Sequence, residues 1–449
     1  MGHSLPAGKT PGATMSTADS SDDPEPFSRL SPPGTPANSN GEAPSPSPAL
    51  RLVQTPPSTV PGPAPGDDGP LFSPPFLRLL GMQAAYGFSF SMFFLLPKYL
   101  AAAGESPSRI GLVMGGFGVA CVATIPFLQV VVARLGRRGA LMAATLALAL
   151  AASVFAAVLP VGIPAIFLRA SEGITWTIMF STAGALTAEL APRGRLAQAI
   201  GLAGAAALIM NAVAPSIGEP LADKFGYRPV FVLAAVAALV AAAFARRLPD
   251  LRPMAAIDPL RLAPTPAANT VDLRARRVPI YIVFGLSGIA FSMLFTFLAP
   301  FALAHGVNQI RDFFIGYTGA AITVRLLGGR LADRLGHRMI ATVALALYGG
   351  VVACTGLFGP HHLYALGICF GLAHGAVFPA VMALLINNTP PHLRPRVLGI
   401  ANGAMSIGVS SVFPAGALIA RIGYPAMFAI AGGLVALAAL LIRRGGEAA

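Results

Sequence analysis

Long apolar stretches recur along the chain from Phe76 to its end. Each runs for about 19–27 residues, enough to cross about 30 Å of hydrocarbon as an α-helix. Because lipid offers no hydrogen-bond partners, a spanning segment has to satisfy its own backbone groups, as a helix does. We predict an all-α membrane protein with twelve transmembrane helices, over residues 78–97, 109–133, 139–160, 162–187, 197–219, 227–245, 278–303, 313–332, 338–358, 362–388, 396–420 and 424–443.

Charged side chains are too scarce for a water-soluble enzyme of this length. Only 11 % of the 449 residues are charged, whereas soluble proteins average about 25 %. The net charge is +13, but no basic face alternates with aromatic side chains as nucleic-acid binding requires. We therefore expect membrane lipids around the protein and no nucleic-acid partner.

The sequence contains no pattern typical of a metal, cofactor or catalytic site. Cys121, Cys354 and Cys369 lie singly inside apolar stretches, which is typical of buried free thiols. The chain lacks the phosphate-binding loop of ATP-driven proteins and any Ser/His/Asp arrangement where water and substrate would meet. We expect no metal, no cofactor and no enzymatic activity.

Residues 1–75 differ in composition from everything that follows. They hold 18 of the 41 prolines and no apolar stretch of useful length. Such a segment buries too little surface to offset its ordering entropy, so we predict a disordered Pro/Ser-rich tail. The polar residues 248–277 lie between the sixth and seventh predicted helices. We interpret them as a linker between two six-helix bundles, residues 76–247 and 278–449.

The basic residues predict the orientation of the helices. With the tail in the cytoplasm, the loops and the end on that side hold 19 Arg and Lys residues, against six in the opposite loops. Basic residues accumulate on the cytoplasmic side of membranes, so we expect both termini there. Heavy use of Ala, Gly, Pro and Arg is typical of a GC-rich bacterial genome, which favours a bacterial inner membrane.

The two predicted bundles repeat one another in sequence. Short segments of the first half reappear in the second, in the same order and 197–205 residues later. Examples are Phe90-Ser91-Met92 with Phe291-Ser292-Met293, and Arg134-Leu135-Gly136-Arg137-Arg138 with Arg334-Leu335-Gly336-His337-Arg338. Two similar bundles around a midplane cavity are the architecture of a transporter whose halves rock.

The most specific string reads Gly329-Arg-Leu-Ala-Asp333-Arg334-Leu-Gly336-His337-Arg338. It resembles the loop signature of the major facilitator superfamily, G-x-L-a-D-r-x-G-r-r. The resemblance implies a loop that latches the two bundles on the inner side, the alternative being a turn that only sets topology. In the first-half copy, Ala133 replaces the Asp and Gln129 the first Gly, while Arg134, Gly136, Arg137 and Arg138 remain. We therefore expect an asymmetric latch with Asp333 as its main anion.

The fourth predicted helix contains Arg169-Ala-Ser-Glu172-Gly173, which resembles the R-x-x-q-G motif of the superfamily. The spacing i, i+3 places Arg169 and Glu172 on one face, and Trp176 continues that stripe. Charges inside a membrane segment face a cavity or each other. A carboxyl group that exchanges a proton beside an arginine is a candidate for coupling, and a static ion pair is the alternative.

Two further helices contain motifs built on Pro and Gly. Ala214-Pro215-Ser216-Ile217-Gly218-Glu219 resembles a degenerate antiporter motif G-P-x-x-G-G, in which Pro215 kinks the helix and Gly218 packs closely. We expect Glu219, near the outer end, to reach water. The tenth helix has Gly367, Gly371 and Gly375 on one close-packing face, followed by Pro379.

The remaining candidates for the cavity are polar side chains on the predicted helices. His374 is a candidate for titration or solute binding, with a structural hydrogen bond as the alternative. Arg325 is placed to bind an anionic solute, to reach the inner surface or to pair with Asp333. Asn211 and Asn402 line the cavity or bridge helices, and Tyr86 and Phe90 form an aromatic stripe for packing or for a substrate wall.

The resemblance implies a secondary transporter, a monomer, that moves a small organic solute by alternating access. Proton-coupled efflux is the favoured mechanism, with Glu172 and Arg169 as the coupling pair. An importer or uniporter of the same fold is one alternative. A non-transporting sensor or scaffold that acts through its tail is another, and deletion of residues 1–75 separates it from a transporter.

Overall fold

The computed structural model describes residues 70–192, 195–250, 270–358, 362–387, 389 and 393–444. The predicted tail up to residue 69 and residues 251–269 of the predicted linker lie outside this part of the chain. The described residues form helices joined by turns, with no strand among them. The prediction of an all-α protein is confirmed.

The helices fall into two halves. The N-terminal half consists of α1 (Pro74–Met92), η2 (Phe93–Leu95), α2 (Leu96–Ala102), α3 (Pro107–Thr124), η3 (Ile125–Phe127), α4 (Leu128–Val158), α5 (Ile163–Leu190), α6 (Leu196–Phe225) and α7 (Tyr227–Arg246). The C-terminal half consists of α8 (Thr270–Ala304), α9 (Arg311–Leu335), α10 (His337–Phe358), α11 (Leu363–Asn387), α12 (Arg394–Ser410) and α13 (Val412–Arg444).

Two of these helices each contain a sharp turn at a glycine. Gly136 in α4 has φ 69° and ψ 168°, and Gly423 in α13 has φ 80° and ψ 167°. Glycine adopts a positive φ at little cost, whereas a side chain makes it strained. Gly336, between α9 and α10, has φ 82° and is the repeat partner of Gly136. The same turn is therefore built from glycine in both halves.

Eight helical stretches of the described residues are long and apolar enough to cross a membrane. Two of them, Pro107–Val158 and Val397–Arg443, are 52 and 47 residues long, and each contains one of the glycine turns. Each of these two has the length of two crossings. The multi-pass membrane fold is confirmed, and the number of twelve helices stays a prediction.

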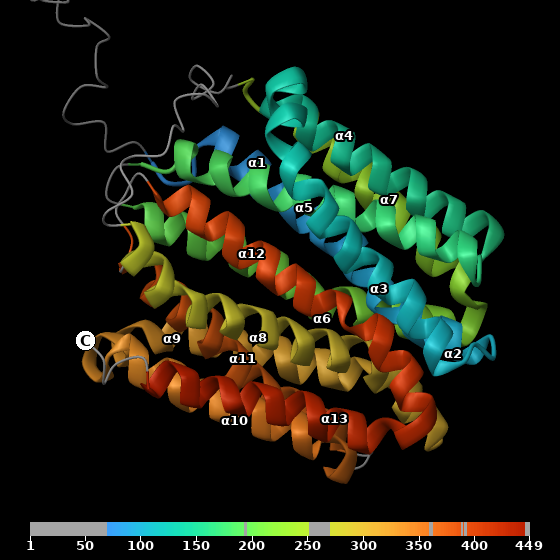
Figure 1. Ribbon diagram of the computed structural model, residues 1–449. Helices are drawn as coiled ribbons and strands as arrows, with labels where there is room; N and C mark the ends of the chain where they lie inside the picture. The colour runs from blue at the N-terminus through green and yellow to red at the C-terminus, as the bar shows by residue number, and fades with distance from the viewer. Residues whose placement is uncertain are drawn as a thin grey trace, which may run out of the picture. The chain divides into compact units, whose positions relative to one another are not determined.

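Each half is held together by its own helix contacts. In the N-terminal half α4 packs on α5 and α7, and α1 packs on α6 and α7. In the C-terminal half α10 packs on α11 and α13, and α8 packs on α12 and α13. Figure 1 shows that α1 begins and α13 ends on the same side. We call this side the terminal face. The opposite side, which contains the turns after α2 and before α9, is called the far face.

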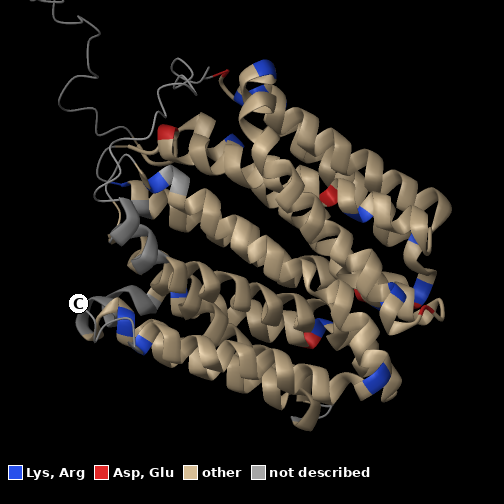
Figure 2. Ribbon diagram, viewed as in Figure 1, with Lys and Arg blue, Asp and Glu red and all other residues tan. Residues whose placement is uncertain are grey.

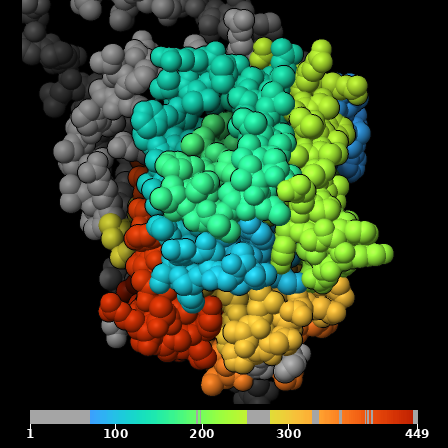
Figure 3. All heavy atoms as spheres, turned by 90° about the vertical axis from the view of Figure 1, so that its right-hand side faces the viewer, coloured from blue at the N-terminus to red at the C-terminus, as the bar shows by residue number. Residues whose placement is uncertain are grey.

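The two halves are in direct contact at the far face. α3 packs on α12 and α13, and α6 packs on α9. A Cβ atom built on Gly111 of α3 would lie 2.4 Å from the carbonyl oxygen of Val412 of α13. Ser108 Oγ donates a hydrogen bond to the Gly416 carbonyl oxygen at 3.4 Å. Figure 3 looks onto this face, where the atoms of both halves meet.

Candidate functional site

An ion pair lies inside the N-terminal half, whereas Figure 2 shows most charged residues near helix ends. Arg169 and Glu172 lie one turn apart on α5, and their side chains are 5 % and 0 % exposed. Arg169 Nη1 donates a hydrogen bond to Glu172 Oε2. Removing charges from water is costly unless they are paired. The structure thus brings the two predicted residues together in an enclosed pair.

Aromatic rings cover the guanidinium group of Arg169. Its Cζ atom lies 4.7 Å from the ring centroid of Phe117 on α3 and 5.8 Å from that of Phe90 on α1. A cation above a ring regains part of the stabilisation that it loses with its hydration shell. Arg169 Nε and Glu172 Oε1 have no hydrogen-bond partner within the described residues. The pair therefore retains an unused donor at Arg169 Nε and an unused acceptor at Glu172 Oε1.

Trp176 lies one turn beyond Glu172 and joins the pair to α1. Its ring stacks on Phe90 with a centroid distance of 4.5 Å and an interplanar angle of 27°. Tyr86, one turn before Phe90, lies 6.5 Å from Trp176 and shares a hydrogen bond of 3.1 Å with Thr175 Oγ1. The predicted aromatic stripe of the first helix therefore packs against the stripe of α5 that contains the ion pair.

The C-terminal half repeats this arrangement with different side chains. A Cβ atom built on Gly173 of α5 would lie 2.3 Å from a carbonyl oxygen of α3, and one on Gly371 of α11 would lie 2.4 Å from a carbonyl oxygen of α9. α5 and α11 therefore pack on α3 and α9 in the same register. Because Trp176 and His374 each follow these glycines by three residues, they occupy equivalent positions.

His374 is buried among aromatic side chains of the C-terminal half. Its ring centroid lies 5.2 Å from that of Phe291 on α8, the repeat partner of Phe90, which contacts Trp176. The hydroxyl oxygen of Tyr317 on α9 lies 3.3 Å from His374 Nδ1, within hydrogen-bond distance. The ring pair between α1 and α5 is therefore repeated between α8 and α11.

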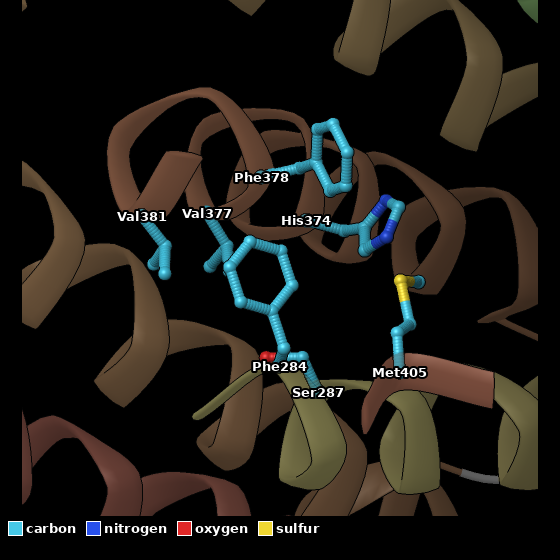
Figure 4. Close-up of a pocket in the computed structure, with 7 residues that line it drawn as sticks. All are labelled: Phe284, Ser287, His374, Val377, Phe378, Val381 and Met405. Atoms are coloured by element: carbon cyan, nitrogen blue, oxygen red, sulfur yellow. The ribbon is translucent and has the colours of Figure 1, made fainter. Parts of the chain in front are cut away.

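A small pocket borders His374 between α8, α11 and α12 (Figure 4). Its volume is about 10 Å³, the space of about one water molecule. The residues that line it are Phe284, Ser287, His374, Val377, Phe378, Val381 and Met405. Ser287 Oγ is buried and has no partner in the described part of the chain. This pocket is a gap inside one half rather than a chamber of solute size.

The structure does not bring His374 and the ion pair into one cluster. The pair contacts α1 and α3, whereas His374 contacts α8 and α9. Asn211 Oδ1 accepts a hydrogen bond of 2.8 Å from Ser91 Oγ and so bridges α6 and α1.

Asn402 and Arg325 lie on helices of the C-terminal half that contact the other half. Asn402 of α12 is half-buried, and its carbonyl oxygen accepts a hydrogen bond from Ser406 Oγ at 2.9 Å. Arg325 of α9 is exposed. Its Nη1 lies 3.7 Å from the position that a Cβ atom of Gly204 on α6 would take. Arg325 therefore lies beside the contact between α6 and α9.

The first-half copy of the predicted latch binds within its own half. Arg137 pairs with Glu189 at the end of α5, and Arg138 Nη2 lies 3.8 Å from Asp250 Oδ2. Arg134 is exposed, and Gly136 forms the turn described above. These contacts join α4 to the end of α5 and to the segment after α7 at the terminal face.

The second-half copy is described only in part. The side chains of Asp333 and Arg334 lie outside the described residues, as does that of the neighbouring Arg330. Gly329 lies within α9, and Arg338 Nε donates to the Ile442 carbonyl oxygen at 2.9 Å. The switching role of this loop therefore stays a prediction.

The predicted packing residues lie at close helix contacts. Pro215 lies inside α6 and Pro379 inside α11. A Cβ atom on Gly218 would lie 2.8 Å from side-chain atoms of the first membrane segment, and one on Gly375 would lie 2.9 Å from Ala321 of α9. A side chain at Gly375 would meet the backbone of α9 and push the two helices apart, whereas one at Gly218 would displace the flexible side chains of Met92 and Leu95.

The expectation that Glu219 reaches water is wrong. Its side chain is 0 % exposed and forms an ion pair of 2.7 Å with Lys98, a residue that sequence reasoning did not select. The available signal was Lys98 itself, a cation that directly follows the first predicted apolar stretch and is followed in turn by apolar residues 99–103, so that it needs a buried partner if the helix continues. Within the described residues, no group of three or more His, Cys, Asp and Glu side chains is arranged to hold a metal ion.

A family model described as the Major Facilitator Superfamily matches residues 79–324 and 312–447. The chain is 27 % identical over 266 residues to the multidrug resistance protein MdtG of Salmonella arizonae. It is 26 % identical over 261 residues to a probable sugar efflux transporter of Mannheimia succiniciproducens. The alignments cover 56 % of this chain and 65 % and 62 % of the relatives, less than two thirds of their length.

Solved structures share the fold at low sequence identity. The nucleoside transporter NupG matches with a TM-score of 0.64 and 15 % identity, covering 83 % of this chain and 99 % of its own. A peptide transporter of the POT type matches with 0.69 and 13 %, covering 83 % and 94 %. The human organic anion transporter MFSD10 matches with 0.61 and 17 %, covering 82 % and 100 %. Likeness at these identities concerns the fold alone.

Proposed function

The chain belongs to the major facilitator superfamily, whose members are membrane transporters rather than enzymes, and we propose that it exports a small organic solute in exchange for protons. The mechanism in this proposal is alternating access, in which the two halves expose a central site first to one face and then to the other. The proposed setting is a bacterial inner membrane with both termini in the cytoplasm, and the proposed working unit is a monomer.

The observation that carries the proposal is the enclosed pair of Arg169 and Glu172. The Glu172 carboxylate has one described cationic partner, Arg169, which is itself covered by aromatic rings, and it loses its main stabilising contact when it gains a proton. Its charge then no longer offsets that of Arg169. The protonated and ionised forms of Glu172 therefore favour different positions of the guanidinium group.

α3 provides a route from this pair to the boundary between the halves. Phe117 of α3 covers Arg169, and Gly111, further toward the far face on the same helix, packs directly on α13. A shift of Arg169 displaces Phe117, and a packed helix transmits such a displacement along its length. In this proposal, protonation of Glu172 changes how α3 packs on the C-terminal half.

The proposed solute site lies between the two repeated ring pairs. Trp176 with Phe90 supplies an apolar aromatic surface, and His374 with Phe291 supplies one that also offers a ring nitrogen. Polar contacts are proposed from Asn211, Asn402 and Arg325, which lie on the helices at the boundary. Aromatic walls with few polar groups suit a small organic solute.

The direction of transport is proposed from two sources. One similar protein is called a multidrug resistance protein and another a probable sugar efflux transporter. The loop between α9 and α10 has the residues of an inner latch, which we propose closes the cytoplasmic side during the cycle. Export against a gradient requires an energy source, and a proton gradient acting on Glu172 supplies it.

Proteoliposomes that contain a pH-sensitive dye test the proposal. Sugars, organic acids and lipophilic cations are added in turn, and solute-dependent proton flux is measured for the wild type and for Glu172→Gln. We expect flux in the wild type and its loss in Glu172→Gln. Glu105→Gln is the matched control, because Glu105 lies in the turn between α2 and α3 and its partner Arg109 has a side chain that is 68 % exposed.

Two outcomes contradict the proposal. Equal proton flux in the wild type and Glu172→Gln shows that coupling lies elsewhere. No flux with any solute, together with no uptake of the radiolabelled solutes, shows that the chain does not carry this class of compound.

A further inference from the structure

Glu219 of α6 binds the first residues of α9 across the boundary between the two halves. Its Oε1 accepts a hydrogen bond from the Ile310 backbone N–H at 2.8 Å, and its Oε2 accepts one from the Arg311 N–H at 2.8 Å. α9 begins at Arg311, so the carboxylate occupies the N-terminal end of a 25-residue helix. Helix N-termini leave N–H groups without partners and stabilise a negative charge.

Lys98 of α2 holds the same carboxylate from the N-terminal half. Its Nζ lies 2.7 Å from Glu219 Oε1, and the two side chains are 4 % and 0 % exposed. A second carboxylate, Asp223 Oδ1, lies 3.3 Å from the same Nζ, but its side chain is 47 % exposed. The charge of Glu219 is therefore compensated from both halves, by an ammonium group on one side and by helix N–H groups on the other.

A layer of aromatic rings lies at the same junction. Phe94 of the first membrane segment stacks on Phe314 of α9 at 5.4 Å with an interplanar angle of 8°. It also meets Phe295 of α8 edge to face at 5.0 Å. These rings fill the apolar space between the halves within one turn of Arg311. The carboxylate therefore supplies the polar, directional part of an otherwise apolar contact.

We propose that Glu219 is a positioning residue of the transport cycle that latches the far face closed. The far face opens only when α6 and α9 separate there, and that separation breaks both hydrogen bonds from the Ile310 and Arg311 N–H groups to Glu219. The bonds therefore stabilise the closed conformation relative to the open one. This inference rests on the proposed function, because a latch is meaningful only in a chain whose halves alternate.

Distance measurements between spin labels at the far face test whether Glu219 holds that face closed. Labels are attached to cysteines introduced at Ala103 and Arg421, which are exposed and belong to different halves, after the three natural cysteines are changed to alanine. Double electron–electron resonance then gives the ratio of the long, open distance to the short, closed distance. Transport of the radiolabelled solutes is measured on the same preparations.

We expect Glu219→Gln to raise the ratio of open to closed about tenfold, because the uncharged amide offers one acceptor oxygen where the carboxylate offers two. Asp223→Asn is the matched control, since it removes a carboxylate beside the same lysine without touching α9, and it should leave the ratio unchanged. Glu219→Asp, which keeps the charge, should recover part of the closed population. We expect Glu219→Gln to fold, because Lys98 keeps Asp223 as a partner.

The outcomes separate the latch from the proposed function. If the wild type transports and all three variants, Glu219→Gln, Glu219→Asp and Asp223→Asn, have the open-to-closed ratio of the wild type, the role of Glu219 at the far face is overturned and the proposed function stands. An equal rise in Glu219→Gln and Asp223→Asn also overturns the latch, since it shows a general effect of charge. If the wild type shows one distance and carries no solute, the proposed function fails.

Discussion

Trp176 and His374 occupy equivalent positions in the two halves, each on a helix that packs through a glycine three residues earlier. Each ring lies against a phenylalanine of the first helix of its half, Phe90 at 4.5 Å and Phe291 at 5.2 Å. One ring is an indole and the other an imidazole. Equivalent positions of the two halves therefore present two chemically different rings.

The first prediction concerns these two rings. Trp176→Ala and His374→Ala should each raise the KM for the transported solute about tenfold. Loss of one ring contact with the solute costs up to about 1.5 kcal/mol, and about 1.4 kcal/mol corresponds to a tenfold change in affinity. Initial rates of uptake into proteoliposomes give the KM. Phe231→Leu is the control, because Phe231 is a buried ring packed on Phe93 and Phe155, away from both pairs. An unchanged KM in both alanine variants contradicts the proposed site.

The second prediction concerns the close approach of α5 to α3. Gly173→Ala should destabilise the protein by about 1–3 kcal/mol, because the new methyl group meets a carbonyl oxygen and forces the helices apart. Gly184→Ala on the same helix should be neutral or stabilising, since a Cβ atom there meets nothing within 4 Å and alanine favours the helix. Thermal unfolding in detergent compares the two. Equal effects would show that the packing at Gly173 is looser than described.

The third prediction separates the stability of the ion pair from its function. Arg169→Gln leaves the Glu172 carboxylate buried without its cation and should destabilise the protein by about 3–5 kcal/mol. The double variant Arg169→Gln with Glu172→Gln should recover most of this loss, because no unpaired charge remains. Thermal unfolding again measures the change. A double variant as unstable as the single one would show that Arg169 acts through packing on Phe117 rather than through charge.

Much of the fold follows from local features of the sequence. Apolar stretches of membrane-spanning length predicted the helices, and repeated strings such as those around Gly136 and Gly336 predicted turns that the structure builds alike. The i, i+3 spacing brought Arg169 and Glu172 together because a helix fixes that geometry without help from the rest of the chain.

The contacts of Glu219 could not be predicted from the sequence, because its partners are far away along the chain. Lys98 is 121 residues away and Ile310 is 91 residues away, so only the packing of α2, α6 and α9 decides that they meet. Position near a helix end predicted exposure, whereas tertiary contacts bury the side chain completely. The equivalence of Trp176 and His374 was hidden for a similar reason, since the two side chains differ and only the glycine contacts align them.

Solute counterflow, measured beside uphill transport, tests the central claim most directly. Proteoliposomes loaded with unlabelled solute take up labelled solute by exchange, which requires the halves to alternate but needs no net proton movement. The account predicts that Glu172→Gln keeps counterflow and loses accumulation driven by a proton gradient, while the wild type shows both. Accumulation by Glu172→Gln at the rate of the wild type would contradict the account, because the buried pair would then not couple protons to transport.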